Sequence, residues 1–107
     1  MKLPLKWEFP GGKQNPGETA ELCIKRELME ELNIEVEILQ RLRDSKYDYP
    51  TFTINLIPFV VQLKAGELIL REHKAFQWLS PEDLKDLDWA LADIPVLEQF
   101  MKSEYAS

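Results

Sequence analysis

The spacing of apolar and polar residues along the chain predicts helices that alternate with strands. Apolar side chains recur at helical spacing after Thr19, a plausible N-cap, and a helix is predicted from about Thr19 to Leu32. Asn33 can adopt the left-handed conformation that often ends a helix. Residues 34–38 then alternate apolar side chains with glutamates, which predicts a half-buried strand.

Further elements follow from β-branched and aromatic runs and from the placement of proline and glycine. They are an extended segment at Leu3–Phe9, a loop at Gly11–Gly17, a turn at Tyr47–Pro50, a long strand at Thr51–Leu63 with an edge or bulge at Pro58, a turn at Ala65–Gly66, a strand at Ala75–Leu79, a helix that starts at Ser80 and Pro81, and a last helix from about Pro95 to Lys102. This order predicts one domain of the α/β or α+β class, a sandwich with a mostly mixed sheet.

Composition and charge narrow the class of protein. The chain has 107 residues, 45% of them hydrophobic and 30% charged, which is typical of one soluble globular domain. The formal net charge of -6 argues against a nucleic acid polymer as partner. It does not argue against a nucleotide, because a bound metal ion can reverse the local sign. A single cysteine, Cys23, and the lack of a long apolar run favour a cytoplasmic protein with no membrane partner.

Three glutamates carry the clearest chemical signal. Glu27, Glu30 and Glu31 are three and four residues apart, so a helix places them on one side. That side also carries small and apolar residues, namely Ala20, Cys23 and Ile24. A solvated charged face is the alternative interpretation. A partly buried cluster of carboxylates needs counter-charge, which Arg26 and a hard cation such as Mg²⁺ or Mn²⁺ would supply.

The glycine-containing loop before this helix adds to the signal. Gly11 and Gly12 allow the backbone to approach a ligand closely, and glycines before a helix are typical of phosphate-binding loops. The loop lacks the Gly-Lys-Ser/Thr ending of a P-loop, and an ordinary turn is the alternative.

Taken together, the segment from Gly12 to Ile34 resembles the Nudix box, the signature of Nudix hydrolases. The match comprises Gly12, Glu18, the run Arg26–Leu28, the pair Glu30 and Glu31, and Ile34 at the signature spacing. Asn33 stands where the family usually has glycine. The run Trp7–Lys13 and the later blocks at 72–82 and 92–97 resemble MutT-like members named CTP pyrophosphohydrolase or 8-oxo-dGTP diphosphatase.

The resemblance implies a Nudix α/β/α sandwich and an enzyme that cleaves a nucleoside triphosphate into a monophosphate and pyrophosphate. It also implies Mg²⁺ as cofactor, with Mn²⁺ as an alternative. The implied metal ligands are Gly11, Glu27, Glu30, Glu31 and Glu72, the implied catalytic residues are Arg26, Glu30, Glu31 and Glu72, and the implied substrate-binding residues are Phe9, Gly12, Lys13 and Asp93.

Several of these residues have a structural alternative. Glu72 is either a metal ligand or base, or a surface residue beside Arg71. His73, the only histidine, is expected to be a loop residue and not a catalytic base. Asp93 matches the position that hydrogen-bonds the base in MutT-like enzymes, and it is also placed to cap the last helix. Phe9 either lines the base pocket or packs in the core.

The beginning of the chain departs from the family pattern, because MutT-like proteins carry further strands before the Trp7 block. Those strands are expected to be missing or replaced, for example by a second copy in a strand-swapped homodimer. Two alternatives to the proposed activity stay open. One is a non-catalytic module that binds a nucleotide, and the other is a hydrolase of another nucleoside diphosphate derivative.

Overall fold

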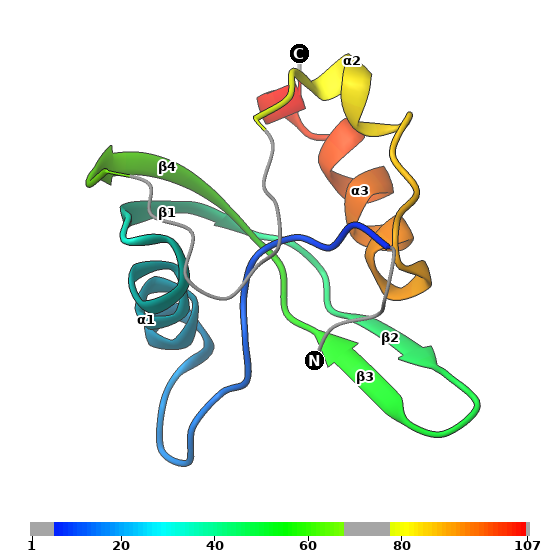
Figure 1. Ribbon diagram of the computed structural model, residues 1–107, viewed down its shortest axis with the longest axis horizontal. Helices are drawn as coiled ribbons and strands as arrows, with labels where there is room; N and C mark the ends of the chain where they lie inside the picture. Colours follow the sequence, from blue (N-terminus) through cyan, green and yellow to red (C-terminus); the bar gives the residue numbers. More distant parts are fainter. Residues whose placement is uncertain (1–5, 68–77, 107) are drawn as a thin grey trace. The chain divides into compact units, whose positions relative to one another are not determined.

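The computed structural model describes residues 6–67 and 78–106, and it contains both helices and strands, as the α+β class does (Figure 1). The elements are α1 (Ala20–Leu32), β1 (Glu35–Arg41), β2 (Ser45–Asp48), β3 (Thr53–Leu56), β4 (Phe59–Ala65), α2 (Pro81–Leu84), the 3-10 turn η1 (Leu91–Asp93), α3 (Ile94–Met101) and the 3-10 turn η2 (Glu104–Ala106). The predicted fold class is confirmed. None of the helices in the described residues is long and apolar enough to cross a membrane.

The chain forms two compact units. In its described part, the first unit comprises residues 6–9, 41–60 and 79–106, and the second comprises residues 10–40, 61–67 and 78. The described strands form two sheets of two strands each, in which β1 pairs with β4 and β2 pairs with β3. The predicted sandwich with a mostly mixed sheet also included the strand at Ala75–Leu79, most of which lies outside the described residues.

In the second unit, α1 packs on β1 and β4 through a small apolar core. Its buried residues are Leu28, Leu32, Ile34 and Val36, with Ile24 and Val61 packed against them. Burial of a side chain of this size contributes about 1.5–3 kcal/mol. The core therefore fixes which side of α1 faces the strands, and it leaves the arc around Glu27 and Glu30 outside the core.

In the first unit, two side-chain hydroxyls of the β2–β3 hairpin bind the backbone of Ala92 in η1. The hairpin is antiparallel, with Ser45 opposite Leu56 and Asp48 opposite Thr53. The Ser45 hydroxyl donates to the Ala92 carbonyl at 3.3 Å, and the Ala92 N–H donates to the Tyr49 hydroxyl at 3.1 Å. These bonds attach η1, and with it Asp93, to the hairpin.

Two predicted elements differ from the structure. Tyr47 and Asp48 belong to strand β2, so the prediction of a turn from Tyr47 was two residues too early. The long strand predicted at Thr51–Leu63 is divided into β3 and β4, and Pro58 lies in the break. Proline has no N–H to donate to a sheet, and the Pro58 carbonyl instead accepts a bond from the Leu42 N–H at 2.9 Å.

The predicted N- and C-terminal elements have mixed outcomes. In the described part of Leu3–Phe9, Trp7 forms only an isolated parallel bridge with Trp89. The strand predicted at Ala75–Leu79 falls mostly outside the described residues, and Trp78 and Leu79 are in neither helix nor strand. The helices predicted after Ser80 and near Pro95 are confirmed as α2 and α3.

Candidate functional site

Helix α1 carries the three glutamates, and local interactions define both of its ends. The Thr19 hydroxyl accepts a hydrogen bond from the Leu22 N–H at 3.1 Å, which confirms the predicted N-cap. Asn33 ends the helix in the left-handed conformation, with φ 59° and ψ 39°, so asparagine serves where the family pattern has glycine. The glutamates therefore lie on a helix of fixed start and end.

Arg26 is the centre of the cluster. Its Nε and Nη2 donate to the two carboxylate oxygens of Glu18 at 2.7 and 2.9 Å. Its Nη1 donates to Glu27 at 2.8 Å and to Glu30 at 3.0 Å, and its Nη2 also donates to the Lys13 carbonyl at 3.1 Å. One guanidinium thus joins the loop to the carboxylate side of α1, as its predicted supporting role requires.

These contacts perturb the ionisation of Glu18 and Arg26. Hydrogen bonds from Arg26, followed by one from the Asn15 N–H, lower the pKa of Glu18 to about 2. The same bonds, first of all those to Glu18, raise the pKa of Arg26. Both groups are therefore charged at neutral pH, and Arg26 remains a permanent counter-charge for the carboxylates.

The three glutamates differ in exposure. Glu31 is buried, with 7% of its surface exposed, and 13% of the Glu27 side chain is exposed. The Glu30 side chain is 58% exposed, so it is the member most open to solvent. The burial of Glu27 and Glu31 argues against the alternative of a merely solvated charged face.

The glycine loop lies against α1. A Cβ on Gly11 would contact Ile24, and a Cβ on Gly12 would overlap the Glu27 carboxyl group. The Gly12 carbonyl accepts a bond from the Cys23 thiol at 3.8 Å. Burial raises the pKa of Cys23, so the thiol keeps the proton that it donates. Cys23 itself is buried.

The donor chemistry of this segment fits a divalent metal ion. Glu27, Glu30 and Glu31 offer carboxylate oxygens, and the loop glycines offer carbonyls, which are the ligands that Mg²⁺ and Mn²⁺ prefer. Within residues 6–67 and 78–106, however, no group of three His, Cys, Asp or Glu side chains is arranged to hold a metal ion. The predicted roles of Glu72 and His73 fall outside the described residues.

The predicted base-binding residues lie in the first unit. Asp93 is buried, and its carboxylate accepts a hydrogen bond from the Phe9 N–H at 3.3 Å. It occupies the N-cap position of α3, as the structural alternative for Asp93 expects, but its side chain makes no capping hydrogen bond. Burial raises the pKa of Asp93 to about 6, against the lowering effect of the Phe9 bond.

Aromatic rings surround this part of the first unit. The Phe9 ring stacks on Trp89 with centroids 4.4 Å apart, which agrees with the packing alternative for Phe9. On the hairpin, Tyr49 lies between Tyr47 and Phe52, with centroid distances of 4.8 and 4.9 Å. The sequence did not predict that the Tyr49 hydroxyl binds η1. The alternation of Tyr47 and Tyr49 could have indicated a strand at this place.

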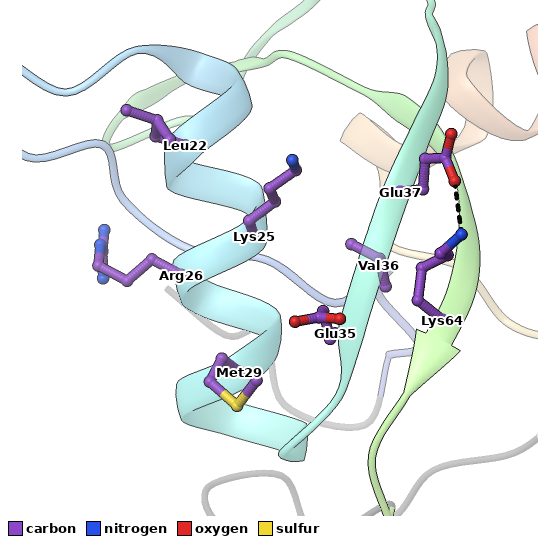
Figure 2. Close-up of a pocket in the computed structure, with 8 residues that line it drawn as sticks. All are labelled: Leu22, Lys25, Arg26, Met29, Glu35, Val36, Glu37 and Lys64. Carbon is purple, nitrogen blue, oxygen red and sulfur yellow. Dashed lines mark ion pairs between the residues drawn. The ribbon is translucent and has the colours of Figure 1, made fainter.

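A groove of about 560 Å³ lies on another flank of α1 (Figure 2). Leu22, Lys25, Arg26 and Met29 of α1, Glu35, Val36 and Glu37 of β1, and Lys64 of β4 line it. None of the three site glutamates is among its lining residues, and an ion pair of 3.0 Å joins Lys64 to Glu37. Arg26 is the one lining residue that also binds the carboxylate cluster.

The sequence matches the NUDIX domain family over residues 2–100. It is 39% identical over 95 residues to CTP pyrophosphohydrolase of Escherichia coli K12, and the match covers 89% of this chain and 70% of that protein. It is 40% identical over 95 residues to putative 8-oxo-dGTP diphosphatase 2 of Mycobacterium tuberculosis H37Rv, and the match covers 86% of this chain and 66% of that protein.

Solved structures agree with this assignment. The solution structure of the E. coli ORF135 protein superposes with a TM-score of 0.78 at 38% identity, over 89% of this chain and 68% of that chain. The solution structure of the Nudix hydrolase MutT from methicillin-resistant Staphylococcus aureus 252 superposes with a TM-score of 0.74 at 36% identity. The match covers 94% of this chain and 78% of that chain. The chain therefore belongs to the NUDIX domain family, among its MutT-like hydrolases.

Proposed function

We propose that the chain hydrolyses a nucleoside triphosphate to a nucleoside monophosphate and pyrophosphate, with Mg²⁺ or Mn²⁺ as cofactor. The observation that carries this proposal is the half-buried carboxylate cluster of α1, which Arg26 connects to the glycine loop. Relatives named CTP pyrophosphohydrolase and 8-oxo-dGTP diphosphatase support CTP, dCTP or an oxidised deoxynucleotide as the substrate.

The proposed roles follow from the chemistry of each group. Glu27, Glu30 and Glu31, with the Gly11 carbonyl and Glu72, would hold the metal ion. When bound, that ion would neutralise phosphate charge and lower the pKa of an attacking water. Arg26 orients the carboxylates through its fork of donors, and Lys13 and Gly12 would bind the phosphates.

Asp93 is proposed to select the base. Its buried carboxyl group can accept a hydrogen bond from an exocyclic amine, which cytosine and the purines adenine and guanine carry. In the structure, its Oδ1 already accepts the Phe9 N–H, and a carboxylate has further acceptor sites for a base. The cytoplasmic location and the homodimer stay predictions.

The direct test is hydrolysis by Glu31→Gln and Glu30→Gln with Mg²⁺ and a panel of CTP, dCTP, dGTP, 8-oxo-dGTP and ADP-ribose. Glutamine keeps the size of the side chain but loses its charge. We expect kcat to fall by about 100-fold or more, the loss typical of a group that acts in the reaction. Glu98→Gln, an exposed change on α3, is the matched control and should retain activity. Full activity in the two site variants would refute the roles assigned to them.

A non-catalytic nucleotide-binding module is the second candidate. Such a module would keep the same glutamates and glycine loop, so these residues do not separate it from the proposed enzyme. Binding of a nucleotide by the wild type without any product on the whole panel would support this candidate. Pyrophosphate release would exclude it.

A further inference from the structure

Gly12 lies directly against the carboxyl group of Glu27. A Cβ atom on Gly12 would overlap the Glu27 Cδ and both of its carboxylate oxygens, at separations that real Cβ atoms essentially never show. The overlapping atoms are the end of a side chain and not backbone. The space that an alanine methyl group would need is therefore filled by the functional group of a predicted metal ligand.

The backbone conformation does not explain why this residue is a glycine. The glycines with positive φ are Gly11, Gly17 and Gly66, and Gly12 is not among them. An alanine could adopt the backbone conformation of Gly12 without the strain of the left-handed region. Gly12 is also exposed, so close packing in the core does not require a glycine. The close contact with the Glu27 carboxyl group is therefore the structural reason for a glycine at this position.

The Glu27 carboxylate is held from a second side by Arg26, whose Nη1 donates to its Oε1 at 2.8 Å. The loop that carries Gly12 is itself attached to α1, because the Arg26 Nη2 donates to the Lys13 carbonyl at 3.1 Å. The distance from Gly12 to α1 is thus fixed by the same guanidinium that binds Glu27. Only 13% of the Glu27 side chain is exposed.

We propose that Gly12 is a positioning residue, whose missing side chain sets where the Glu27 carboxylate lies. The contact with Glu27 stands on geometry alone, and only its consequence for metal binding and catalysis rests on the proposed function. An added methyl group would displace the flexible end of Glu27 at little cost to the fold. The effect on function would be large, since a misplacement of about 1 Å at a reacting centre can cost about 100-fold in rate.

The first experiment needs neither metal nor substrate. NMR of the Arg26 guanidinium in the metal-free protein compares the wild type with Gly12→Ala. We expect the Nη1 resonances, which report on Glu27 and Glu30, to shift. The Nε resonance, which reports on Glu18, should change little. Gly17→Asn is the matched control, because a side chain there points into open space and asparagine tolerates its φ of 78°. An unchanged Nη1 resonance in Gly12→Ala would overturn the proposal.

The second experiment is a double-mutant cycle of Gly12→Ala and Glu27→Asp, read by Mn²⁺ affinity from electron paramagnetic resonance and by kcat. We expect Gly12→Ala to weaken Mn²⁺ binding by about 10- to 100-fold, as loss of a group that orients a ligand does. Aspartate is one methylene shorter, so its carboxylate is withdrawn from Gly12. The double variant should therefore be no worse than Glu27→Asp alone.

Two results of the cycle would count against the proposal. If the fold-losses in Mn²⁺ affinity and kcat of the two single variants multiply in the double variant, Gly12 acts independently of Glu27. If Gly12→Ala binds Mn²⁺ and turns over like the wild type, its methyl group does not move the carboxylate. A wild type that neither binds Mn²⁺ nor hydrolyses any nucleotide would refute the proposed function instead, and the metal-free NMR comparison would then decide about Gly12 alone.

Discussion

Arg26 shows how much of the site depends on a single side chain. Its planar fork donates to Glu18 through two nitrogens and to Glu27 and Glu30 through the third. A lysine has one compact ammonium group and could not bind three carboxylates in these directions. The sequence placed an arginine beside the glutamates, but only the structure shows that it also holds the Lys13 carbonyl of the loop.

The charge state of Asp93 in mildly acidic solution depends on the fold. Burial raises its pKa from 3.8 to about 6, so the folded chain retains a proton between these pH values that the unfolded chain has lost. This contribution to stability is full below about pH 4 and is lost as the pH rises through 6. At pH 7.5 the charged carboxylate is buried, and it destabilises the folded state.

Asp93→Asn is accordingly expected to raise the free energy of unfolding at pH 7.5. Asparagine keeps an oxygen acceptor for the Phe9 N–H and removes the buried charge. The gain is at most about 3 kcal/mol, since one pKa unit corresponds to about 1.4 kcal/mol. Urea unfolding at pH 7.5 and at pH 4.5 measures it, and the advantage should shrink at the lower pH. An advantage that is equal at both pH values would show that the carboxyl group does not titrate with this shift.

At the scale of elements, the position of the glutamates depends on where α1 begins and ends. Thr19 provides the N-cap, and Asn33 ends the helix before β1. The Asn33 side chain also donates to the Glu67 carbonyl at 3.0 Å, which ties this end of the helix to the residues after β4. The ends of α1 were predicted from the sequence, because caps depend on neighbouring residues.

Replacement of Asn33 tests this helix end. Asn33→Ala removes the short polar side chain that lets asparagine adopt the left-handed conformation. We expect the free energy of unfolding to fall by about 1–2 kcal/mol. Asn33→Gly accepts the same φ of 59° and should lose less, mainly through the missing bond to Glu67. Urea denaturation of both variants gives the comparison. Equal losses would mean that the hydrogen bond, and not the backbone conformation, is what matters there.

At the scale of the whole molecule, charge and metal binding are connected. The chain has a formal net charge of -6, and several of its carboxylates gather on one side of α1. A cation that binds the folded state more tightly than the unfolded state stabilises the fold by mass action. Any salt also screens the repulsion between carboxylates, so the two effects must be separated.

Mg²⁺ or Mn²⁺ is therefore expected to raise the melting temperature beyond the effect of ionic strength. At a concentration 100 times its Kd, a bound ion adds about 2.7 kcal/mol to the free energy of unfolding. Differential scanning fluorimetry with MgCl₂, MnCl₂ and NaCl at matched ionic strength measures the increment. Glu27→Gln should lose the specific part and keep the response to NaCl. A wild type that responds equally to all three salts would contradict a specific metal site.

The sequence predicted much of what is local. The Gly12 to Ile34 spacing identified the family, Thr19 and Asn33 marked the ends of α1, and Ser80 and Pro81 marked the start of α2. It was wrong where neighbours in space decide the outcome. Tyr47 and Asp48 form a strand because Ile54 and Thr53 lie opposite them. Asp93 is at the N-cap of α3, but its side chain binds the Phe9 N–H and not the helix.

The sequence by itself thus determined the family, the chemistry of the α1 glutamates and the ends of the helices. These depend on residue types and short spacings, which the chain carries before it folds. The tertiary structure decided that Glu27 and Glu31 are half-buried or buried, that the Glu27 carboxylate lies between Arg26 and Gly12, and that the pKa of Asp93 is raised. Burial and contacts between distant residues exist only in the packed chain, and they set the charge and position of the reactive groups.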